Sequence, residues 1–307
     1  MRKTKTLILI LAAILVTSLF TGCGTNVTDS EKNTAISLTD MMGRQVNLSK
    51  PASKVVVLTA SDCEIIFALG AGNTVIARGE FCNYPEEALE ITQVSSGSET
   101  NIEQIISLQP EVVIMNSMAQ TTEQVDALEN AGIKVVMNDA KTIEEVYTSI
   151  EIVGKVVGKE SEATNMIDGM KKGFEEIVAS AEKDSEKTVY FEVSPLEYGL
   201  WTAGKGTFMD EIANMLGVTN IFADVNGWAE ISQEQVIERN PDYIVTIYMG
   251  IEGQKPPTEE IMSRKGWENV EAVLNGNVQT VNSDEISRPG PRLVDAAKAL
   301  RELFYGK

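Results

Sequence analysis

The sequence contains no histidine and very little cysteine. Among its 307 residues there are 0 histidines and 3 cysteines, which are Cys23, Cys63 and Cys82. The absence of histidine excludes Ser-His-Asp and Cys-His nucleophilic catalysis. It also argues against metal sites built on histidine, and the spacing of Cys63 and Cys82 matches no metal motif, so we expect no metal. In an exported chain these two cysteines form either one disulfide or two unpaired thiols.

Positive charge is scarce as well. The chain has 26 lysines and arginines against 45 aspartates and glutamates, which gives a formal net charge of −19. Nucleic acids and anionic membrane surfaces are therefore poor partners. A basic protein surface is a suitable one.

The apolar run near the N-terminus is too short to cross a membrane comfortably. It covers residues 7–20, whereas a spanning helix needs roughly 20 apolar residues. Arg2, Lys3 and Lys5 precede it, and small residues follow it at 21–22. This order is typical of a cleaved signal peptide.

Residues 20–23 read Phe-Thr-Gly-Cys and resemble a bacterial lipobox, in which the cysteine becomes the lipid-modified N-terminus. We predict that Cys23 carries the lipid and holds the protein on the extracytoplasmic face of the cell membrane. A diacylglycerol and an amide-linked acyl chain together suffice for stable anchoring. The alternative is an ordinary signal peptide with an incidental cysteine.

Short β-rich runs alternate with helical stretches along most of the chain. Residues 54–58 and 112–115 are typical of buried strands, and residues 61–69 and 122–131 of helices. This alternation predicts parallel sheets covered by helices. Between two such series, residues 159–183 carry apolar side chains at helical spacing, which predicts one long helix.

We therefore predict an α/β protein with two parallel-sheet lobes joined by one long helix. The expected parts are a signal peptide at 1–22, a lipid-anchored tether with the segment leading into the first lobe at 23–50, an N-terminal lobe at 51–157, a linking helix at 158–185 and a C-terminal lobe at 186–307.

One segment occurs twice. Residues 101–114 align without gaps with residues 232–245, at a constant offset of 131 (232 − 101). In each copy a capped helix carries Glu-Gln on its first turn, ends at proline and leads into a buried strand. Either the two lobes are related, or any helix–proline–strand unit looks like this. Because parallel sheets bind ligands at the carboxyl ends of their strands, two facing lobes would form a ligand cleft.

Six motifs in order resemble the cobalamin and iron-siderophore class of substrate-binding proteins of ABC importers, with the closest likeness to vitamin B12-binding proteins. They occupy residues 55–59, 81–85, 101–105, 200–205, 228–235 and 287–292. The resemblance implies a class III periplasmic-binding-protein fold, in which one rigid helix links two α/β lobes. It also implies capture of a small molecule for permease subunits, with no cofactor and no catalysis.

The resemblance implies ligand contacts at Phe81, Trp201 and Trp228, and a polar pair, Asp284 and Arg288, at the far wall. Large planar macrocycles bind by burial against aromatic faces, and a few polar groups fix their orientation. The alternatives are that Phe81 packs under its own loop, that the tryptophans are surface anchors, and that Asp284 and Arg288 only pair with each other.

The expected ligand is a cobalamin-like corrinoid, and a ferric siderophore or haem is the alternative. Gly97 and Asn116 stand where the B12-binding relative has tryptophans, so a smaller corrinoid or an iron chelate could also fit. The resemblance further implies that Glu103 and Glu234, which are equivalent in the repeat, meet arginines on the two permease subunits. The alternative is that each glutamate only stabilises the N-terminus of its helix.

Two other functions compete with ligand capture. A hydrolase would use paired carboxylates such as Asp62 and Glu80, but no catalytic motif accompanies them. A surface sensor or adhesin could use the same fold. We predict that the protein is not an enzyme.

Overall fold

The computed structural model describes residues 35–117, 121–181, 185–247 and 255–306. The predicted signal peptide, Cys23 and most of the predicted tether therefore lie outside the described residues. Within these four ranges, no helix is both long enough and apolar enough to cross a membrane.

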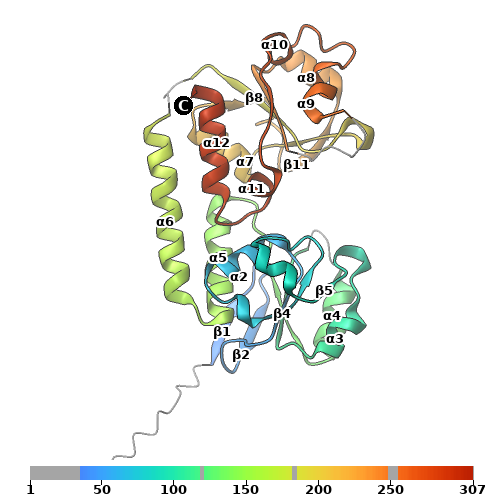
Figure 1. Ribbon diagram of the computed structural model, residues 1–307, viewed down its shortest axis with the longest axis vertical. Coiled ribbons are helices and arrows are strands. Elements are labelled where there is room, and N and C mark those ends of the chain that lie inside the picture. The colour runs from blue at the N-terminus through green and yellow to red at the C-terminus, as the bar shows by residue number, and fades with distance from the viewer. Residues whose placement is uncertain (1–34, 118–120, 182–184, 248–254, 307) are drawn as a thin grey trace, which may run out of the picture. The chain divides into compact units, whose positions relative to one another are not determined.

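The first lobe is built on a five-stranded parallel sheet (Figure 1). Its strands, in spatial order, are β5 (Gln93–Val94), β4 (Val75–Gly79), β3 (Val55–Val57), β6 (Val112–Met115) and β7 (Lys134–Met137). On one face, Val55 and Val57 pack against α2 (Ala60–Ala68) and α5 (Ile143–Val157). On the other, Val56 packs against α3 (Ile102–Leu108) and α4 (Thr122–Asn130). The two central strands β3 and β6 are apolar throughout because helices cover both faces of the sheet.

A hairpin precedes this sheet and belongs to the first lobe. Strands β1 (Ile36–Thr39) and β2 (Gln45–Leu48) pair antiparallel, and Leu38, Val46 and Leu48 are buried in the main core. The Asp40 carboxylate accepts hydrogen bonds from the Arg44 backbone at 2.8 Å and the Met137 backbone at 3.1 Å, which fixes the hairpin beside β7. Part of the segment that we assigned to the tether is therefore folded. Strands of four residues are too short for their alternation to stand out in the sequence.

The lobes are joined by α6 (Glu160–Ala179), a helix of 20 residues within the predicted range of 158–185. Its buried stripe, Ala163, Ile167, Met170, Phe174 and Ile177, is the one that the apolar spacing predicts. It packs between α5 of the first lobe and α12 (Leu293–Tyr305) of the second.

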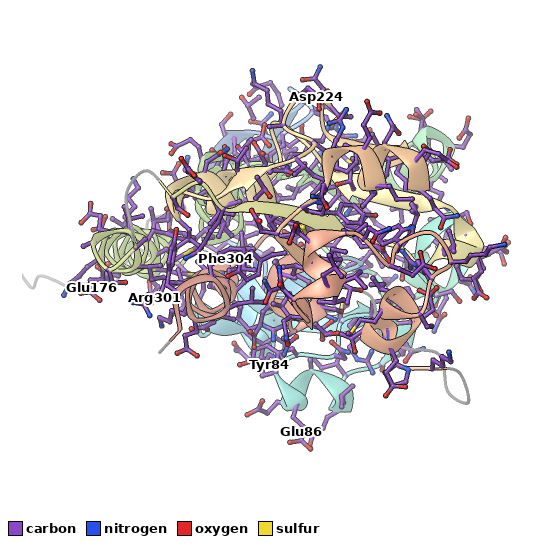
Figure 2. The ribbon with its side chains drawn as sticks, turned by 90° about the horizontal axis from the view of Figure 1, so that it is seen from above. Tyr84, Glu86, Glu176, Asp224, Arg301 and Phe304 are labelled. Carbon is purple, nitrogen blue, oxygen red and sulfur yellow. The ribbon has the colours of Figure 1, made fainter. Side chains whose placement is uncertain are left out.

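Two glycines allow this close packing. A Cβ atom at Gly154 would lie 2.7 Å from the Ala163 side chain, and one at Gly173 would lie 2.7 Å from Val294. Figure 2 shows α12 beside α6, and Arg301 of α12 donates a hydrogen bond to the Ser180 carbonyl at 3.2 Å. The linking helix is thereby held by both lobes along its buried face.

The second lobe has a mixed sheet of six strands, whereas we expected a parallel one. Strands β8 (Thr188–Glu192), β12 (Tyr243–Thr246) and β13 (Val278–Thr280) are parallel, and β10 (Thr219–Asn220) pairs in parallel with β8. Strand β9 (Leu200–Ala203) runs antiparallel to both β8 and β11 (Trp228–Ile231). The short connection from β8 to β9 explains the difference, because parallel neighbours need a crossover of a dozen or more residues.

Helices and short turns complete the second lobe and the loops. The helices are α7 (Phe208–Met215), α8 (Gln233–Arg239), α9 (Pro257–Met262), α10 (Glu271–Leu274) and α11 (Ser283–Ser287). The 3₁₀ turns are η2 (Gly72–Thr74), η3 (Glu86–Glu90), η4 (Gly97–Glu99) and η5 (Leu196–Tyr198).

The sequence repeat is also a structural repeat. Asn101 caps α3 by accepting from the Gln104 backbone at 3.0 Å, and Ser232 caps α8 by accepting from the Gln235 backbone at 3.3 Å. Each helix ends on a left-handed residue, Gln109 with φ 52° and Asn240 with φ 43°. In the described part of the chain, these are the only non-glycine residues with positive φ.

The acidic residue that follows the proline of the repeat makes equivalent hydrogen bonds in each lobe. The Glu111 carboxylate accepts from the Ser53 backbone at 2.6 Å and the Ser53 hydroxyl at 3.0 Å. The Asp242 carboxylate accepts from the Thr188 backbone and hydroxyl, both at 2.8 Å. Ser53 and Thr188 lie at the starts of β3 and β8, so each copy fastens the first strand of its lobe's sheet. A shared device of this kind favours two related lobes over a chance likeness.

Candidate functional site

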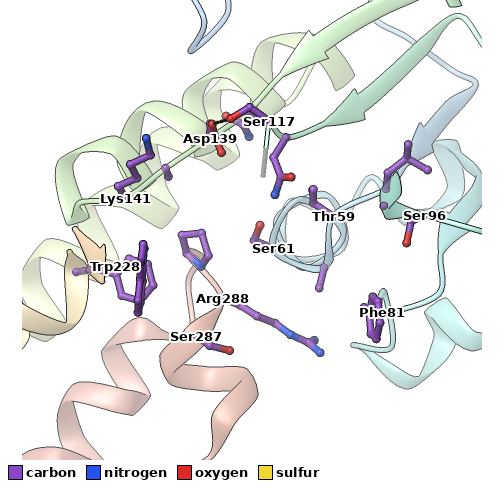
Figure 3. A pocket seen from close by; sticks show the side chains of 18 residues that line it. Thr59, Ser61, Phe81, Ser96, Ser117, Asp139, Lys141, Trp228, Ser287 and Arg288 are labelled. Carbon is purple, nitrogen blue, oxygen red and sulfur yellow. Dashed lines mark hydrogen bonds between the residues drawn. The ribbon is translucent and has the colours of Figure 1, made fainter. Parts of the chain in front are cut away.

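A cavity of about 520 Å³ lies between the two lobes, at the carboxyl edge of the first sheet (Figure 3). Each strand of that sheet sends the residues after it into the lining: Leu58 follows β3, Phe81 follows β4, Ser96 follows β5, Asn116 follows β6 and Asn138 follows β7. The second lobe contributes Phe208, Trp228, Ser287, Arg288 and Pro289. The site therefore lies where ligands bind in parallel α/β sheets.

Phe81 and Trp228 flank the cavity from opposite sides (Figure 3). Phe81 is 67% exposed, so most of its ring is free to meet a ligand. Trp228 is half-buried, and its ring packs edge-to-face on Phe208 at a centroid distance of 5.7 Å. Phe208 is a lining residue that the sequence analysis missed, because an apolar residue at the start of an amphipathic helix looks like any core position.

Trp201 lies outside the cavity lining. It pairs with Glu230 across β9 and β11, while Trp228 pairs with Ala203 two positions along the same strands. Residues two apart on a strand share a face. The two tryptophans are therefore on one face of the sheet, with Trp201, which is 39% exposed, at the more distant position.

Arg288 lines the cavity but is already engaged in ion pairs. It contacts Asp284 at 2.8 Å, the pairing that the sequence analysis gave as the alternative to ligand contact, and Glu64 of the first lobe at 2.8 Å. Asp284 itself is not in the lining. Arg292 also contacts Glu64, at 2.6 Å, and its guanidinium lies 4.1 Å from the centre of the Tyr84 ring.

We call Glu64, Asp284, Arg288 and Arg292 the interlobe clasp. Glu64 is only 2% exposed, and burying a carboxylate at such a position requires positive partners. The hydrogen bonds that Arg292 donates to Glu64 outweigh the opposing effect of burial and raise the pKa of Arg292. Glu64 was not among the predicted site residues, although a glutamate inside the apolar run of residues 63–69 indicates a buried carboxylate that needs a positive partner.

The floor of the cavity is polar and has a buried carboxyl behind it. Thr59 and Asn138 line the floor, and both donate hydrogen bonds to Asp62, which is 1% exposed. Asn138 also donates to the Ser149 hydroxyl at 2.6 Å. Burial, opposed by those hydrogen bonds and reinforced by nearby Asp139, raises the pKa of Asp62 to about 7.

Charges around the cavity are nearly balanced. Its charged lining residues are Asp139, Lys141 and Arg288, and Asp139 accepts a hydrogen bond from Ser117. The other polar lining residues are serine, threonine and asparagine. No group of three or more potential metal-binding residues occurs in the part of the chain that is described. The lining thus favours an uncharged ligand that is rich in hydrogen-bonding groups.

The carboxylates of the hydrolase interpretation do not meet in this cavity. Asp62 is buried behind the floor, Glu80 is exposed, and neither belongs to the lining.

Glu103 and Glu234 are exposed on the first turns of α3 and α8, one on each lobe. Gly97 and Asn116 both line the first-lobe wall.

Residues 55–285 match the periplasmic binding protein family. The chain belongs to this family. It is 34% identical to the ABC transporter substrate-binding lipoprotein YvrC of Bacillus subtilis (strain 168), over 96% of this chain and 95% of that protein. It is 30% identical to the vitamin B12-binding protein of Salmonella typhimurium (strain LT2), over 81% of this chain and 89% of that protein.

A solved structure with the same fold is that of a possible iron-binding (periplasmic solute-binding) protein from Staphylococcus epidermidis ATCC 12228. Its TM-score is 0.72 at 30% identity, and the match covers 83% of this chain and 100% of that one. The predicted family and the predicted fold class, two lobes and one linking helix, are thus confirmed for this periplasmic binding protein.

Proposed function

We propose that this periplasmic binding protein captures a cobalamin-like corrinoid outside the cytoplasm and delivers it to an ABC importer. The main support is the cavity, in which two aromatic side chains flank a floor of uncharged polar groups. A corrin is a large, nearly flat ring whose edge carries amides. Its faces would pack on Phe81 and Trp228, and its amides would exchange hydrogen bonds with Asn116, Ser117 and the floor.

Trp201 would act as an outer contact. The cavity encloses about 520 Å³, so a bulky ligand would extend beyond it. The face shared by Trp228 and Trp201 continues from the cavity along β9 and β11. A ligand that follows this face would meet Trp201 at its outer end.

Haem fits this cavity less well than a corrinoid. Proteins hold haem iron with histidine, cysteine, methionine or tyrosine. None of these residue types is in the cavity lining as far as the chain is described, and the whole sequence has 0 histidines.

A ferric siderophore is the alternative ligand. Many ferric chelates are anionic and need uncompensated positive charge. Arg288 is paired with Glu64 and Asp284, which leaves Lys141 beside Asp139 as the remaining basic group in the lining. The iron-binding and B12-binding names of the relatives support both ligand classes, so the preference for a corrinoid rests on the cavity.

Anchoring and docking complete the proposal. Cys23 would carry the lipid that holds the protein at the membrane, as the name of YvrC also suggests. Glu103 and Glu234 would meet basic residues on the two permease subunits. Their equivalent, exposed positions on separate lobes support this role, since two spaced ion pairs can set orientation.

Calorimetry on the full chain, purified in detergent, tests the choice of ligand. Cyanocobalamin and a ferric tris-catecholate siderophore, which is anionic, are titrated separately into the same protein preparation. We expect saturable heat with cyanocobalamin and little or none with the siderophore. Tight siderophore binding without corrinoid binding would reverse the order.

A further inference from the structure

Two buried thiols lie together beside the cavity wall. Cys63 is on α2, Cys82 is in the loop after β4, and both are 0% exposed within the same core. The Cys82 sulfur lies 3.7 Å from the Val57 carbonyl, with hydrogen-bond geometry. Both cysteines are free thiols in the structure, and interaction with the Cys82 thiol, together with burial, raises the pKa of Cys63.

The fold brings both residues to the end of β3. On one side, the chain turns from β3 into α2, and the Cys63 backbone donates to the Thr59 carbonyl at 3.1 Å. On the other, β4 passes so close to β3 that a Cβ atom at Gly79 would lie 2.6 Å from the Leu58 carbonyl oxygen. The Cys82 backbone then donates to the Gly79 carbonyl at 3.1 Å, which turns the cysteine inward.

We propose that Cys63 and Cys82 form a disulfide that fastens the loop carrying Phe81 to α2. Phe81 precedes Cys82 directly and forms one wall of the cavity, and Ala60 and Ser61 at the start of α2 also line it. The bond would therefore join two segments of the ligand site. Disulfides form and persist in proteins that act outside the cytoplasm, where a periplasmic binding protein works.

The chemistry is a thiol–disulfide exchange with a disulfide oxidant, either a protein disulfide or a small-molecule disulfide. The Cys82 thiolate attacks one sulfur of the oxidant, and the other sulfur leaves as a thiol after it takes up a proton. The Cys63 thiolate then attacks the Cys82 sulfur of this mixed disulfide and releases the second thiol. The two cysteines lose two electrons and two protons in total, and the oxidant is reduced to two thiols.

Burial determines when this reaction occurs. The thiolate is the attacking form, and a raised pKa together with full burial makes the folded dithiol unreactive. The exchange therefore takes place before α2 and the Phe81 loop pack together. The resulting disulfide is a permanent structural bond and not a redox switch.

Mass spectrometry of the full chain, isolated from the membranes of cells that export it, tests the bond directly. The protein is unfolded in acid, its free thiols are blocked with N-ethylmaleimide, and it is then digested. We expect one peptide pair linked through Cys63 and Cys82, lighter by two hydrogen atoms than the two free peptides. Labelling of both cysteines without prior reduction would overturn the proposal.

Thermal unfolding gives a second readout that does not depend on any ligand. Protein that has been reduced while unfolded and then refolded in reductant should melt about 5 °C below the untreated protein, since the closed loop no longer restricts the unfolded chain. The Cys63→Ala/Cys82→Ala variant, treated in the same way, should show no such shift. Equal behaviour of wild type and this variant would contradict the proposal. Neither readout depends on whether the ligand is a corrinoid.

Discussion

At the residue scale, Trp228 is the aromatic side chain that the structure holds most firmly beside the cavity. Its backbone is fixed by pairing with Ala203, and its ring by the edge-to-face contact with Phe208 at 5.7 Å. The exposed part of a ring held in this way can bind a flat ligand without losing much side-chain freedom. Preorganised contacts of this kind are the ones that contribute most to affinity.

Replacing Trp228 by alanine should therefore weaken corrinoid binding by about 1–3 kcal/mol, because an aromatic face is lost from the site. Calorimetry on wild type and variant measures this difference. Tyr198→Ala is a suitable control, since Tyr198 is 70% exposed and outside the cavity lining. If both variants bind like wild type, Trp228 does not contact the ligand.

Asp62 should make the free energy of unfolding depend on pH. Its pKa is about 7 in the folded protein and about 3.8 when unfolded, because burial disfavours the charged form. Between these values the folded state binds the extra proton, so the free energy of unfolding should fall as pH rises from about 4 to about 7. The contribution of Asp62 to this fall is roughly 3 kcal/mol.

Urea denaturation at pH 5 and pH 8 measures this contribution. Asp62→Asn keeps the size of the side chain but cannot titrate, so the variant should lose less stability than wild type between the two pH values. Other buried carboxyls remain in both proteins, and the comparison isolates Asp62. An identical loss in both proteins would mean that Asp62 is ionised throughout.

At the scale of elements, the repeated unit is a helix, a proline, an acidic residue and a strand. The acidic residue holds the start of the first strand of the sheet, through Ser53 in one lobe and Thr188 in the other. Each carboxylate accepts both a backbone N–H and a hydroxyl. The two lobes should therefore respond in the same way when this residue is removed.

We expect Glu111→Ala and Asp242→Ala each to lower the free energy of unfolding by about 1–2 kcal/mol, because at least two donors at or just before the start of a strand lose their acceptor. Chemical denaturation provides the measurement, with Glu238→Ala on the exposed face of α8 as the control. If only one of the two substitutions lowered the free energy of unfolding, the equivalent contacts would not stabilise the two lobes equally.

The elements differ in how far the sequence predicts them. The linking helix and the capped helices follow from patterns within one segment, such as the stripe from Ala163 to Ile177 and the caps Thr142 and Ser232. The four-residue strands of the β1–β2 hairpin are too short for a clear alternation. The antiparallel pairing of β9 with β11 joins segments that are far apart in the sequence, which no local pattern encodes. Trp228 is predictable from its sequence motif, although it lies in strand β11. The roles of Phe208 and of the Glu64–Arg292 contact appear only when the lobes are in place.

At the scale of the whole molecule, two features limit the motion of the lobes. The linking helix is one continuous element packed on α5 and α12, and the interlobe clasp joins Glu64 to Arg288 and Arg292 beside the cavity. Large closures need a few residues that absorb changes in φ and ψ, and an uninterrupted helix offers no such place. We therefore expect little closure on binding.

Small-angle X-ray scattering tests this expectation. The radius of gyration of the full chain should be the same, within experimental error, before and after saturation with cyanocobalamin. A marked contraction would show that the helix and the clasp permit a large closure.

Docking to the importer is also a property of the whole molecule. Glu103 and Glu234 are exposed on separate lobes, and charge reversal at both should abolish uptake while ligand affinity and melting temperature stay near the wild-type values. The physical reason is that rim charges set orientation and encounter more than stability, in a way that salt weakens. Uptake of labelled ligand by cells that carry Glu103→Lys with Glu234→Lys measures the effect.

A matched control changes the net charge equally at sites away from α3 and α8. Glu86 on η3 and Glu176 on α6 are exposed and point outward (Figure 2), so Glu86→Lys with Glu176→Lys should leave uptake intact. Equal loss in both double variants would indicate a general charge effect. A large drop in melting temperature for the docking variant alone would favour the simpler role of stabilising two helix N-termini.

Retention of a coloured ligand shows directly whether the cavity binds a corrinoid, haem or a ferric siderophore. The full chain is mixed in turn with cyanocobalamin, haem and an anionic ferric tris-catecholate siderophore, then desalted, and the visible absorbance of the protein fraction is recorded. We predict that the cobalamin spectrum remains with the protein at close to one ligand per chain, and that haem and the siderophore are largely removed. A protein fraction that retains the siderophore or haem but no cobalamin would contradict the account.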